Sequence, residues 1–250
     1  MSSKTLYSEY SSFARILNEA WGPESSETAL PHIEELLLKH LSKGANILEL
    51  CCGTGQLAQK LQNKGYQVTG IDGSAEVLHY ARENSPNSKF IHEDARFFKF
   101  PFKFDGVVCV DYGLNHVINH EELSSVFENV YAALIENGWF MFDLRLDKTY
   151  EGSWNNSMIG DVKDDYAWAL KRLYKPEEKI GNIHITIFQL IEDNWQRADN
   201  TWLVRGYEQE EVISMLKNVG FTTVNCYSIE PNVAADDLDR VYFVCGKTIC

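Results

Sequence analysis

Apolar residues gather in short runs that alternate with amphipathic stretches over the first 145 residues. Such runs predict strands, and the periodicity between them predicts helices. The expected strands are 46–50, 67–72, 89–92, 105–111 and 139–144. The expected helices are 56–64, one capped by Ser74 and running to 84, and 121–135, ended by Asn137-Gly138. Short strands alternating with helices favour a parallel sheet covered on both faces.

The two ends of the chain extend this pattern. Residues 7–41 predict two helical pieces, which we expect Gly22-Pro23 to interrupt. Near the C-terminus, a helix at 209–219 is followed by strands at 222–229 and 240–245. We therefore expect an α/β fold with a doubly wound, mostly parallel, seven-stranded sheet.

The pattern changes between residues 147 and 205. Alternating residues predict strands at 166–174 and 180–191, with a third at 201–207, and no helix separates them. We interpret this segment as a small antiparallel lid inserted after the fifth strand. The predicted division is a main domain of residues 1–146 and 206–250, with residues 147–205 as the lid.

Chemically interesting residues follow the ends of the parallel strands, the edge at which such sheets bind ligands. They are Glu49 to Gly55, Asp72-Gly73, Asp94-Ala95 and Asp111-Tyr112. The glycine turn at 53–55 lacks the lysine of a phosphate-binding loop, because Gln56 follows it. The spacing of its glycines does not exclude a dinucleotide site. Asp72 would suit the ribose of a dinucleotide or of another nucleoside cofactor. Glu49 would crowd a pyrophosphate but suits a ligand that carries an ammonium and a sulfonium.

Several motifs occur together in an order typical of one family. They are Glu49-Leu-Cys51-Cys-Gly53-Thr-Gly55, Gly70-Ile-Asp72-Gly-Ser74, Asp94-Ala95, Leu114-Asn-His116 and Phe142-Asp143. In this combination the chain resembles the class I S-adenosylmethionine-dependent methyltransferases, which have a Rossmann-like fold. The resemblance covers residues 30–144 and 206–247. The family's loop has a glycine where this chain has Cys51.

The resemblance implies a methyl transfer to a small-molecule acceptor, most readily at nitrogen or oxygen, with S-adenosylmethionine as cofactor. Tyr10, in a segment similar to an arm over the cofactor, joins the implied cofactor contacts. The full set is Tyr10, Glu49, Cys51, Gly53, Thr54, Gly55, Asp72, Gly73, Asp94, Ala95 and Asp111. His116 and Tyr112 are the candidate catalytic residues; the alternative for His116 is a hydrogen bond to the main chain. Five lid residues are either pocket lining or sheet packing: Tyr166, Trp168, Arg172, His184 and Trp202.

The composition limits the classes of partner that the protein is expected to bind. The net charge of -13 argues against nucleic acid, and no apolar run reaches the ~20 residues of a membrane helix. With no secretory signal, we expect a cytoplasmic protein whose six cysteines are reduced. Cysteine spacing predicts no metal site. A homodimer, a nicotinamide-dependent oxidoreductase and a non-catalytic binder of the cofactor stay open.

Overall fold

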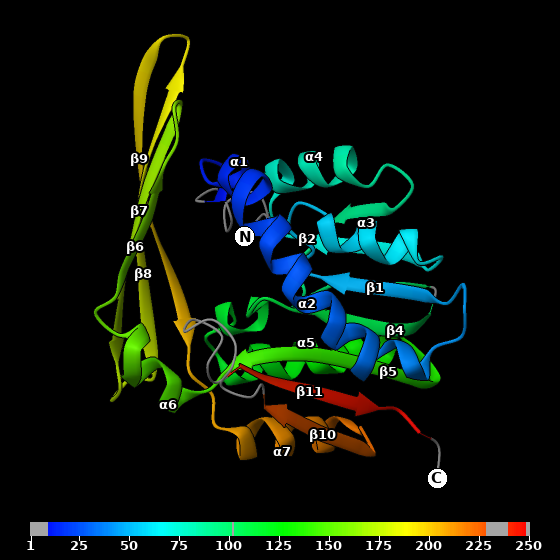
Figure 1. The fold of residues 1–250 in the computed structure, drawn as a ribbon. Coiled ribbons are helices and arrows are strands. Elements are labelled where there is room, and N and C mark those ends of the chain that lie inside the picture. The colour runs from blue at the N-terminus through cyan, green and yellow to red at the C-terminus, as the bar shows by residue number, and fades with distance from the viewer. Residues whose placement is uncertain (1–9, 102, 229–239, 249–250) are drawn as a thin grey trace.

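The structure, a computed structural model, contains two β-sheets and describes residues 10–101, 103–228 and 240–248. The main sheet has seven strands in the order β10-β11-β5-β4-β1-β2-β3. The second has four, in the order β6-β7-β8-β9, and we call it the lid. Figure 1 shows the lid standing beyond the carboxyl ends of the parallel strands. Within the described residues, no helix is long and apolar enough to cross a membrane.

The main sheet confirms the predicted α/β architecture. Only β11 runs against its neighbours, pairing antiparallel with both β10 and β5, so the sheet is mostly parallel. The strands are β1 (Asn46–Leu50), β2 (Gln67–Asp72), β3 (Lys89–His92), β4 (Phe104–Cys109), β5 (Leu134–Arg145), β10 (Thr223–Ser228) and β11 (Arg240–Gly246).

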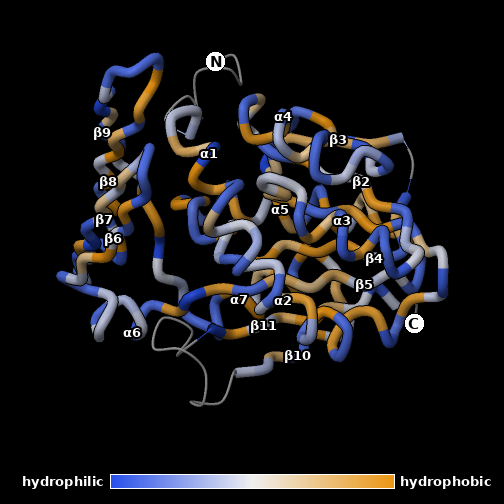
Figure 2. Tube along the Cα trace, turned by 45° about the horizontal axis from the view of Figure 1, so that its top comes forward, coloured by the Kyte–Doolittle hydropathy of each residue, from blue (hydrophilic) through white to orange (hydrophobic). Residues whose placement is uncertain are grey.

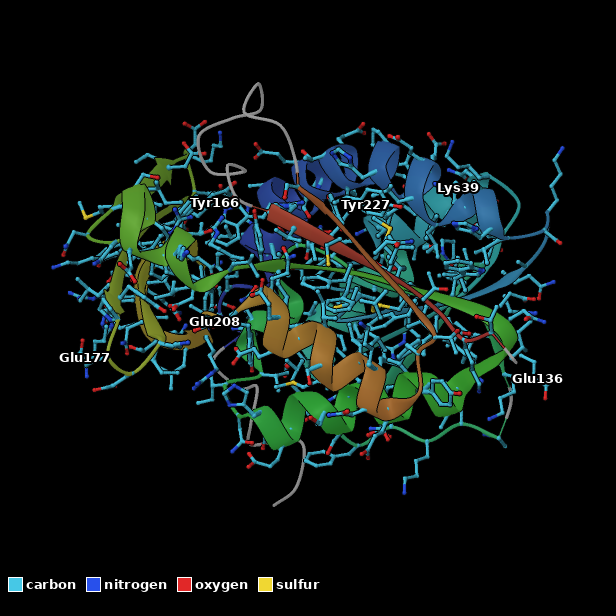
Figure 3. The ribbon with its side chains drawn as sticks, turned by 90° about the horizontal axis from the view of Figure 1, so that it is seen from below. Lys39, Glu136, Tyr166, Glu177, Glu208 and Tyr227 are labelled. Carbon is cyan, nitrogen blue, oxygen red and sulfur yellow. The ribbon has the colours of Figure 1, made fainter. Side chains whose placement is uncertain are left out.

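Helices cover both faces of the main sheet. Those of eight residues or more are α2 (Gly22–Leu36), α3 (Gln56–Asn63), α4 (Ala75–Asn84), α5 (His120–Ala133) and α7 (Gln209–Val219). Helices α2 and α3 bury apolar residues in one core cluster, whereas α5 and α7 belong to another. Figure 3 shows α5 and α7 side by side, with Glu208 at the start of α7. The two clusters are the apolar layers of a doubly wound sheet.

The predicted interruption at Gly22-Pro23 is wrong. The backbone stays helical from α1 (Ala14–Ile16) through the wide turn η3 (Leu17–Trp21) into α2. Pro23 lies in the first turn of α2, where its missing N–H costs little. The π-type turn at 17–21 supplies the change in hydrogen-bond register that precedes it.

Helix α5 ends two residues earlier than predicted, and β5 begins earlier. Leu134 already pairs with Phe104, and a register shift follows before Gly106 pairs with Trp139. Asn137 within this stretch has φ of +62°. The Asn137-Gly138 signal therefore marks an irregularity in β5 and not the end of a helix.

The antiparallel lid after β5 is confirmed, with four strands where three were predicted. They are β6 (Met158–Val162), β7 (Tyr166–Lys175), β8 (Ile180–Ile191) and β9 (Asn194–Arg205). Strand β6 was not predicted, and β9 starts at Asn194 instead of residue 201. The first half of β9 is largely exposed, which removes the alternation that identifies a strand. Figure 2 shows hydrophilic and hydrophobic stretches side by side at this end of the lid.

The inner face of the lid packs on the N-terminal helices. Phe13 and Ile16 share a buried cluster with Trp168, Ile185 and Trp202. Phe13 meets Trp202 edge to face, with ring centroids 5.0 Å apart. This cluster joins the lid and the chain's N-terminal part beside the carboxyl edge of the main sheet.

Candidate functional site

The loop between β1 and α3 is wound unusually tightly. Cys51, Gly53 and Gly55 all have left-handed backbones, with φ of +52°, +53° and +81°. A Cβ at Gly55 would lie 2.9 Å from the Cα of Ala81 in α4, so only glycine fits there. Cys51 holds a left-handed backbone conformation that favours glycine, at a cost of about 1 kcal/mol. Such a loop exposes main-chain groups to a ligand.

Asp72, at the end of β2, fixes this loop. Its carboxylate accepts hydrogen bonds from the main-chain N–H of Gly53 at 3.0 Å and of Ser74 at 2.9 Å. Burial raises the pKa of Asp72, while these N–H groups act in the opposite direction. The arrangement brings the predicted ribose carboxylate against the predicted glycine loop.

Glu49 is a buried carboxyl group beside this loop. Its side chain is 4% exposed, and its Oε2 has no hydrogen-bond partner within the described part of the chain. Burial, with a contribution from the charge of Asp72, raises the pKa of Glu49 to about 8. A buried carboxylate of this kind is stabilised by a cation. The residues therefore fit the ammonium and sulfonium of S-adenosylmethionine.

Thr54 and Gly73, two further residues predicted to contact the cofactor, form hydrogen bonds within the protein itself. Thr54 is buried; its hydroxyl donates to Oε1 of Gln56, and its carbonyl accepts from Asn84. The carbonyl of Gly73 is 2.8 Å from Nε2 of His92. Thr54 thus shapes the loop from inside, whereas Gly73 borders Asp72 at the loop's outer side.

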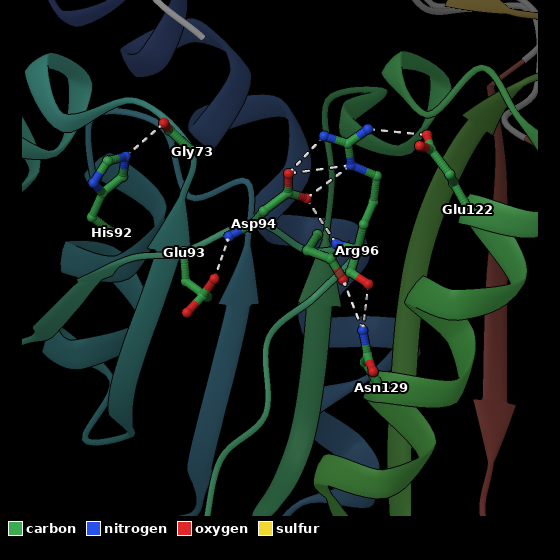
Figure 4. A network of polar contacts seen from close by, with 8 residues as sticks. Gly73, His92, Glu93, Asp94, Arg96, Glu122 and Asn129 are labelled. Carbon is green, nitrogen blue, oxygen red and sulfur yellow. Dashed lines mark hydrogen bonds and ion pairs between the residues drawn. The ribbon is translucent and has the colours of Figure 1, made fainter. Parts of the chain in front are cut away.

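Asp94 and Ala95 follow β3 and are held by α5 (Figure 4). Both Asp94 oxygens contact the guanidinium of Arg96, which also bonds Glu122 at 3.0 Å. Asn129 donates to the carbonyl of Arg96 at 2.9 Å. Asp94 is 6% exposed, so its carboxylate is oriented by a rigid network at the far side of the same sheet edge.

The turn after β4 contains two strained residues in succession. Asp111 and Tyr112 have φ of +63° and +58°. The buried carboxylate of Asp143 accepts from the main-chain N–H of both, at 3.1 and 2.8 Å. Burial raises the pKa of Asp143 to about 6, although the charge of Arg240 opposes this. Asp143 therefore stabilises a backbone that presents Asp111 and Tyr112 to the site.

Two arginines enclose the ring of Tyr112. The guanidinium carbons of Arg145 and Arg240 each lie 4.4 Å from its centroid. Arg240 also donates to the phenol oxygen at 3.0 Å. Burial raises the pKa of Tyr112, which keeps the phenol neutral. Its side chain is consequently fixed on the β4–β5–β11 side of the edge.

His116 connects the N-terminal arm with this turn. It ends η5 (Gly113–His116), and its Nδ1 is 3.2 Å from the hydroxyl of Tyr10. Tyr10 stacks on Trp202 of the lid at 4.7 Å. Surrounding protein lowers the pKa of His116 to about 4, and a main-chain hydrogen bond at Leu203 acts in the opposite direction. His116 nevertheless keeps an exposed surface.

The lid residues divide between its two faces. Tyr166, Trp168 and Trp202 are buried in the cluster with the N-terminal helices, and the indole N–H groups of both tryptophans lack acceptors among the described residues. His184 is exposed on the opposite face, 3.0 Å from the hydroxyl of Thr201. The guanidinium of Arg172 is 5.7 Å from the ring of Trp154. Packing thus accounts for most of the lid aromatics.

Several residues of the site carried no sequence signal for their role. Arg145 and Arg240 meet only because β5 and β11 pair antiparallel at those positions. Asn115 is fully buried and joins η5 to the ends of β5 and β9. Asp143 and Asn115 both occur in motifs that resemble the family, and this resemblance is the sequence signal that could have pointed to them.

Comparisons with known proteins agree with this geometry. Residues 47–138 match a family described as a methyltransferase domain. YqeM of Bacillus subtilis, a proposed methyltransferase, is 29% identical over 219 residues, which cover 83% of this chain and 86% of YqeM.

Solved structures of similar fold include an S-adenosylmethionine-dependent methyltransferase from Clostridium acetobutylicum. Its TM-score is 0.76 at 19% identity, covering 96% of this chain and 99% of that one. A second is CalS10, an amino pentose methyltransferase from Micromonospora echinaspora with S-adenosylmethionine bound. Its TM-score is 0.70 at 17% identity, covering 89% and 91% of the two chains. Residues 47–138 thus match a methyltransferase domain in sequence, and the chain shares over most of its length the fold of S-adenosylmethionine-dependent methyltransferases.

Proposed function

We propose that this protein is an enzyme that transfers the methyl group of S-adenosylmethionine to a nitrogen or oxygen of a small-molecule acceptor. The observation that carries the proposal is the buried Glu49 carboxylate, whose Oε2 has no partner among the described residues, directly beneath a glycine loop. A cationic ligand would supply that partner. The same carboxylate would repel the pyrophosphate of a nicotinamide cofactor.

The proposed cofactor contacts line one edge of the sheet. They are Tyr10, Glu49, Cys51, Gly53, Thr54, Gly55, Asp72, Gly73, Asp94, Ala95 and Asp111. Asp72 would accept hydrogen bonds from the ribose, and Glu49 would face the cationic end. Residues 1–146 and 206–250 would then bind the cofactor, while residues 147–205 would cover the acceptor.

Bound S-adenosylmethionine would supply an electrophilic methyl group on a good leaving group. The protein would then have to align the acceptor and exclude water. His116 is neutral at pH 7 because its pKa is lowered to about 4, so it can accept a proton from the acceptor. Tyr112, held by Arg240, would orient the acceptor from the neighbouring strand end. An amine acceptor agrees with the amino sugar methylated by CalS10.

Asp72→Ala tests the cofactor assignment. We expect this change to weaken S-adenosylmethionine binding at least tenfold in calorimetry, because the ribose and the Gly53 N–H both lose their acceptor. Asp199→Ala, an exposed carboxylate on β9, is the matched control and should bind normally. Unchanged affinity in the Asp72 variant would remove the ribose role.

Turnover separates the enzyme from the two alternatives. Tritium from the methyl group should appear in at least one member of a panel of amines, phenols and carboxylates. Tight binding with no transfer to any of them would favour a non-catalytic binder. Saturable NADH fluorescence, with no S-adenosylmethionine binding, would favour an oxidoreductase.

A further inference from the structure

Two thiols lie together where the glycine loop meets the end of β4. Strands β1 and β4 are parallel neighbours, with Glu49 beside Val108. Cys51 follows β1 directly, and Cys109 is the last residue of β4. Paired strands are about 4.8 Å apart, and disulfides join Cα atoms separated by about 4.4–6.8 Å. By this register Cys51 falls one position beyond Cys109, and a hydrogen bond between the two thiols brings them within reach of one another.

Gly113 leaves room for both sulfurs. A Cβ at this position would lie 3.2 Å from Sγ of Cys109 and 3.3 Å from Sγ of Cys51. It would also lie 3.0 Å from Cβ of Cys51, closer than ordinary contacts allow. Both sulfurs thus face the same bare stretch of backbone. Their interaction, together with burial, raises the pKa of the Cys109 thiol.

The two thiols differ in access to solvent. Cys51 is exposed, whereas Cys109 has 0% exposure. An oxidant from solution therefore reaches Cys51 first. Cys109 is the adjacent thiol that can react with the oxidised product, the arrangement of an attacked and a resolving cysteine.

We propose that Cys51 and Cys109 are a peroxide-reactive pair whose disulfide ties the cofactor loop to the end of β4. The Cys51 thiol attacks hydrogen peroxide, its O–O bond breaks, and one water leaves as Cys51 becomes a sulfenic acid. The Cys109 sulfur then displaces the hydroxyl, forming the S–S bond, and its proton departs with that hydroxyl as a second water. Peroxide is reduced, and the two thiols are oxidised by two electrons in total.

The disulfide would act on the cofactor site because Cys51 lies in the same loop as Gly53, whose main-chain N–H donates to Asp72. This consequence rests on the proposed function, whereas the bond itself does not. Drawing the strained, left-handed Cys51 toward β4 changes the main-chain groups offered by the loop. We expect S-adenosylmethionine affinity to fall at least tenfold on oxidation and to return with dithiothreitol.

Non-reducing peptide mass mapping of the full chain after hydrogen peroxide treatment tests the bond. The expected product is a peptide pair joined through Cys51 and Cys109, which dithiothreitol separates. Cys109→Ala should abolish the pair and leave a Cys51 sulfenic acid that dimedone labels. Failure to form the pair at a peroxide dose that oxidises Cys51 would overturn the proposal, as would an unreactive Cys51.

Cys226 and Cys245 provide the matched control. They lie on paired strands but are offset by two residues, since Val224 is the residue opposite Cys245. They should stay uncrosslinked, and Cys226→Ala should leave the Cys51–Cys109 yield unchanged. Calorimetry then compares reduced and oxidised protein. If the reduced protein binds S-adenosylmethionine and the crosslinked protein binds it equally well, the effect on the cofactor site is refuted. If the reduced protein does not bind it, the proposed function fails, and the peptide map still decides the disulfide.

Discussion

At the scale of single residues, Glu49 is a carboxyl group whose charged form is disfavoured by its surroundings. Its side chain is buried beside Asp72, and its pKa is raised to about 8. The folded protein therefore holds a proton that the unfolded chain loses near pH 4.5. The contribution of Glu49 to the free energy of unfolding is therefore fully present below pH 4.5. It is lost as the pH rises through 8, where the folded protein also loses the proton.

Glu49→Gln should separate stability from binding. At pH 8 we expect the ligand-free variant to be more stable than wild type by roughly 1–4 kcal/mol, because the charged form is no longer required. At pH 5 the difference should nearly vanish. Urea unfolding at both pH values measures this, and S-adenosylmethionine affinity should fall at least tenfold. A variant less stable than wild type at pH 8 would show that Glu49 has a structural partner.

His116 also makes a prediction at the residue scale. If it accepts the acceptor's proton, His116→Asn should lower kcat by about 100-fold while the S-adenosylmethionine Kd stays constant. Because its pKa is lowered to about 4, wild-type activity should persist below pH 6 and decline only near pH 4. The measurement is a pH profile of kcat on an acceptor from the panel. A rise in KM with kcat unchanged would instead indicate that His116 positions Tyr10 against the lid and does not accept a proton.

At the scale of elements, Asn115 fastens η5 to two strands. Its Nδ2 donates to the carbonyls of Arg145 and Arg205, and its Oδ1 accepts from the N–H of Arg145. One buried side chain thus holds the end of β5 against the end of β9. The lid and the main sheet are joined at this point by hydrogen bonds and not only by apolar contact.

Asn115→Ala should lower the free energy of unfolding by about 3 kcal/mol, since the three groups it satisfies remain buried. Denaturant unfolding measures the loss. Asn225→Ala, at an exposed position of β10, is the control and should change stability by less than about 0.5 kcal/mol. Equal effects of the two changes would contradict the role of Asn115.

At the scale of the whole molecule, the candidate site lies between three bodies. The main sheet supplies Glu49, Asp72 and Asp143, and the N-terminal helices supply Tyr10. The lid supplies Trp202, on which Tyr10 stacks. Cofactor and acceptor would therefore lie where these parts meet, and the contact of Tyr10 with the lid would help to exclude water from the reaction.

The main sheet could be predicted because each of its strands has a local pattern, and the ligand edge follows from parallel topology alone. The glycine loop and Asp72 could be predicted for the same reason. The positions of Arg145 and Arg240 and the stacking of Tyr10 on Trp202 could not be predicted, because they depend on contacts between residues far apart in the sequence. Strand β6 and the outer half of β9 were not predicted, because an exposed strand does not need alternating apolar and polar residues.

Titration of S-adenosylmethionine into the protein at pH 7 tests the central claim most directly. Calorimetry in two buffers of different ionisation enthalpy measures both the affinity and the protons released. The account predicts saturable one-site binding with release of a proton from Glu49, and Glu49→Gln should lack this release while sharing any titration of the ligand's own amine. Absence of binding, or binding with equal proton release in both proteins, would contradict it.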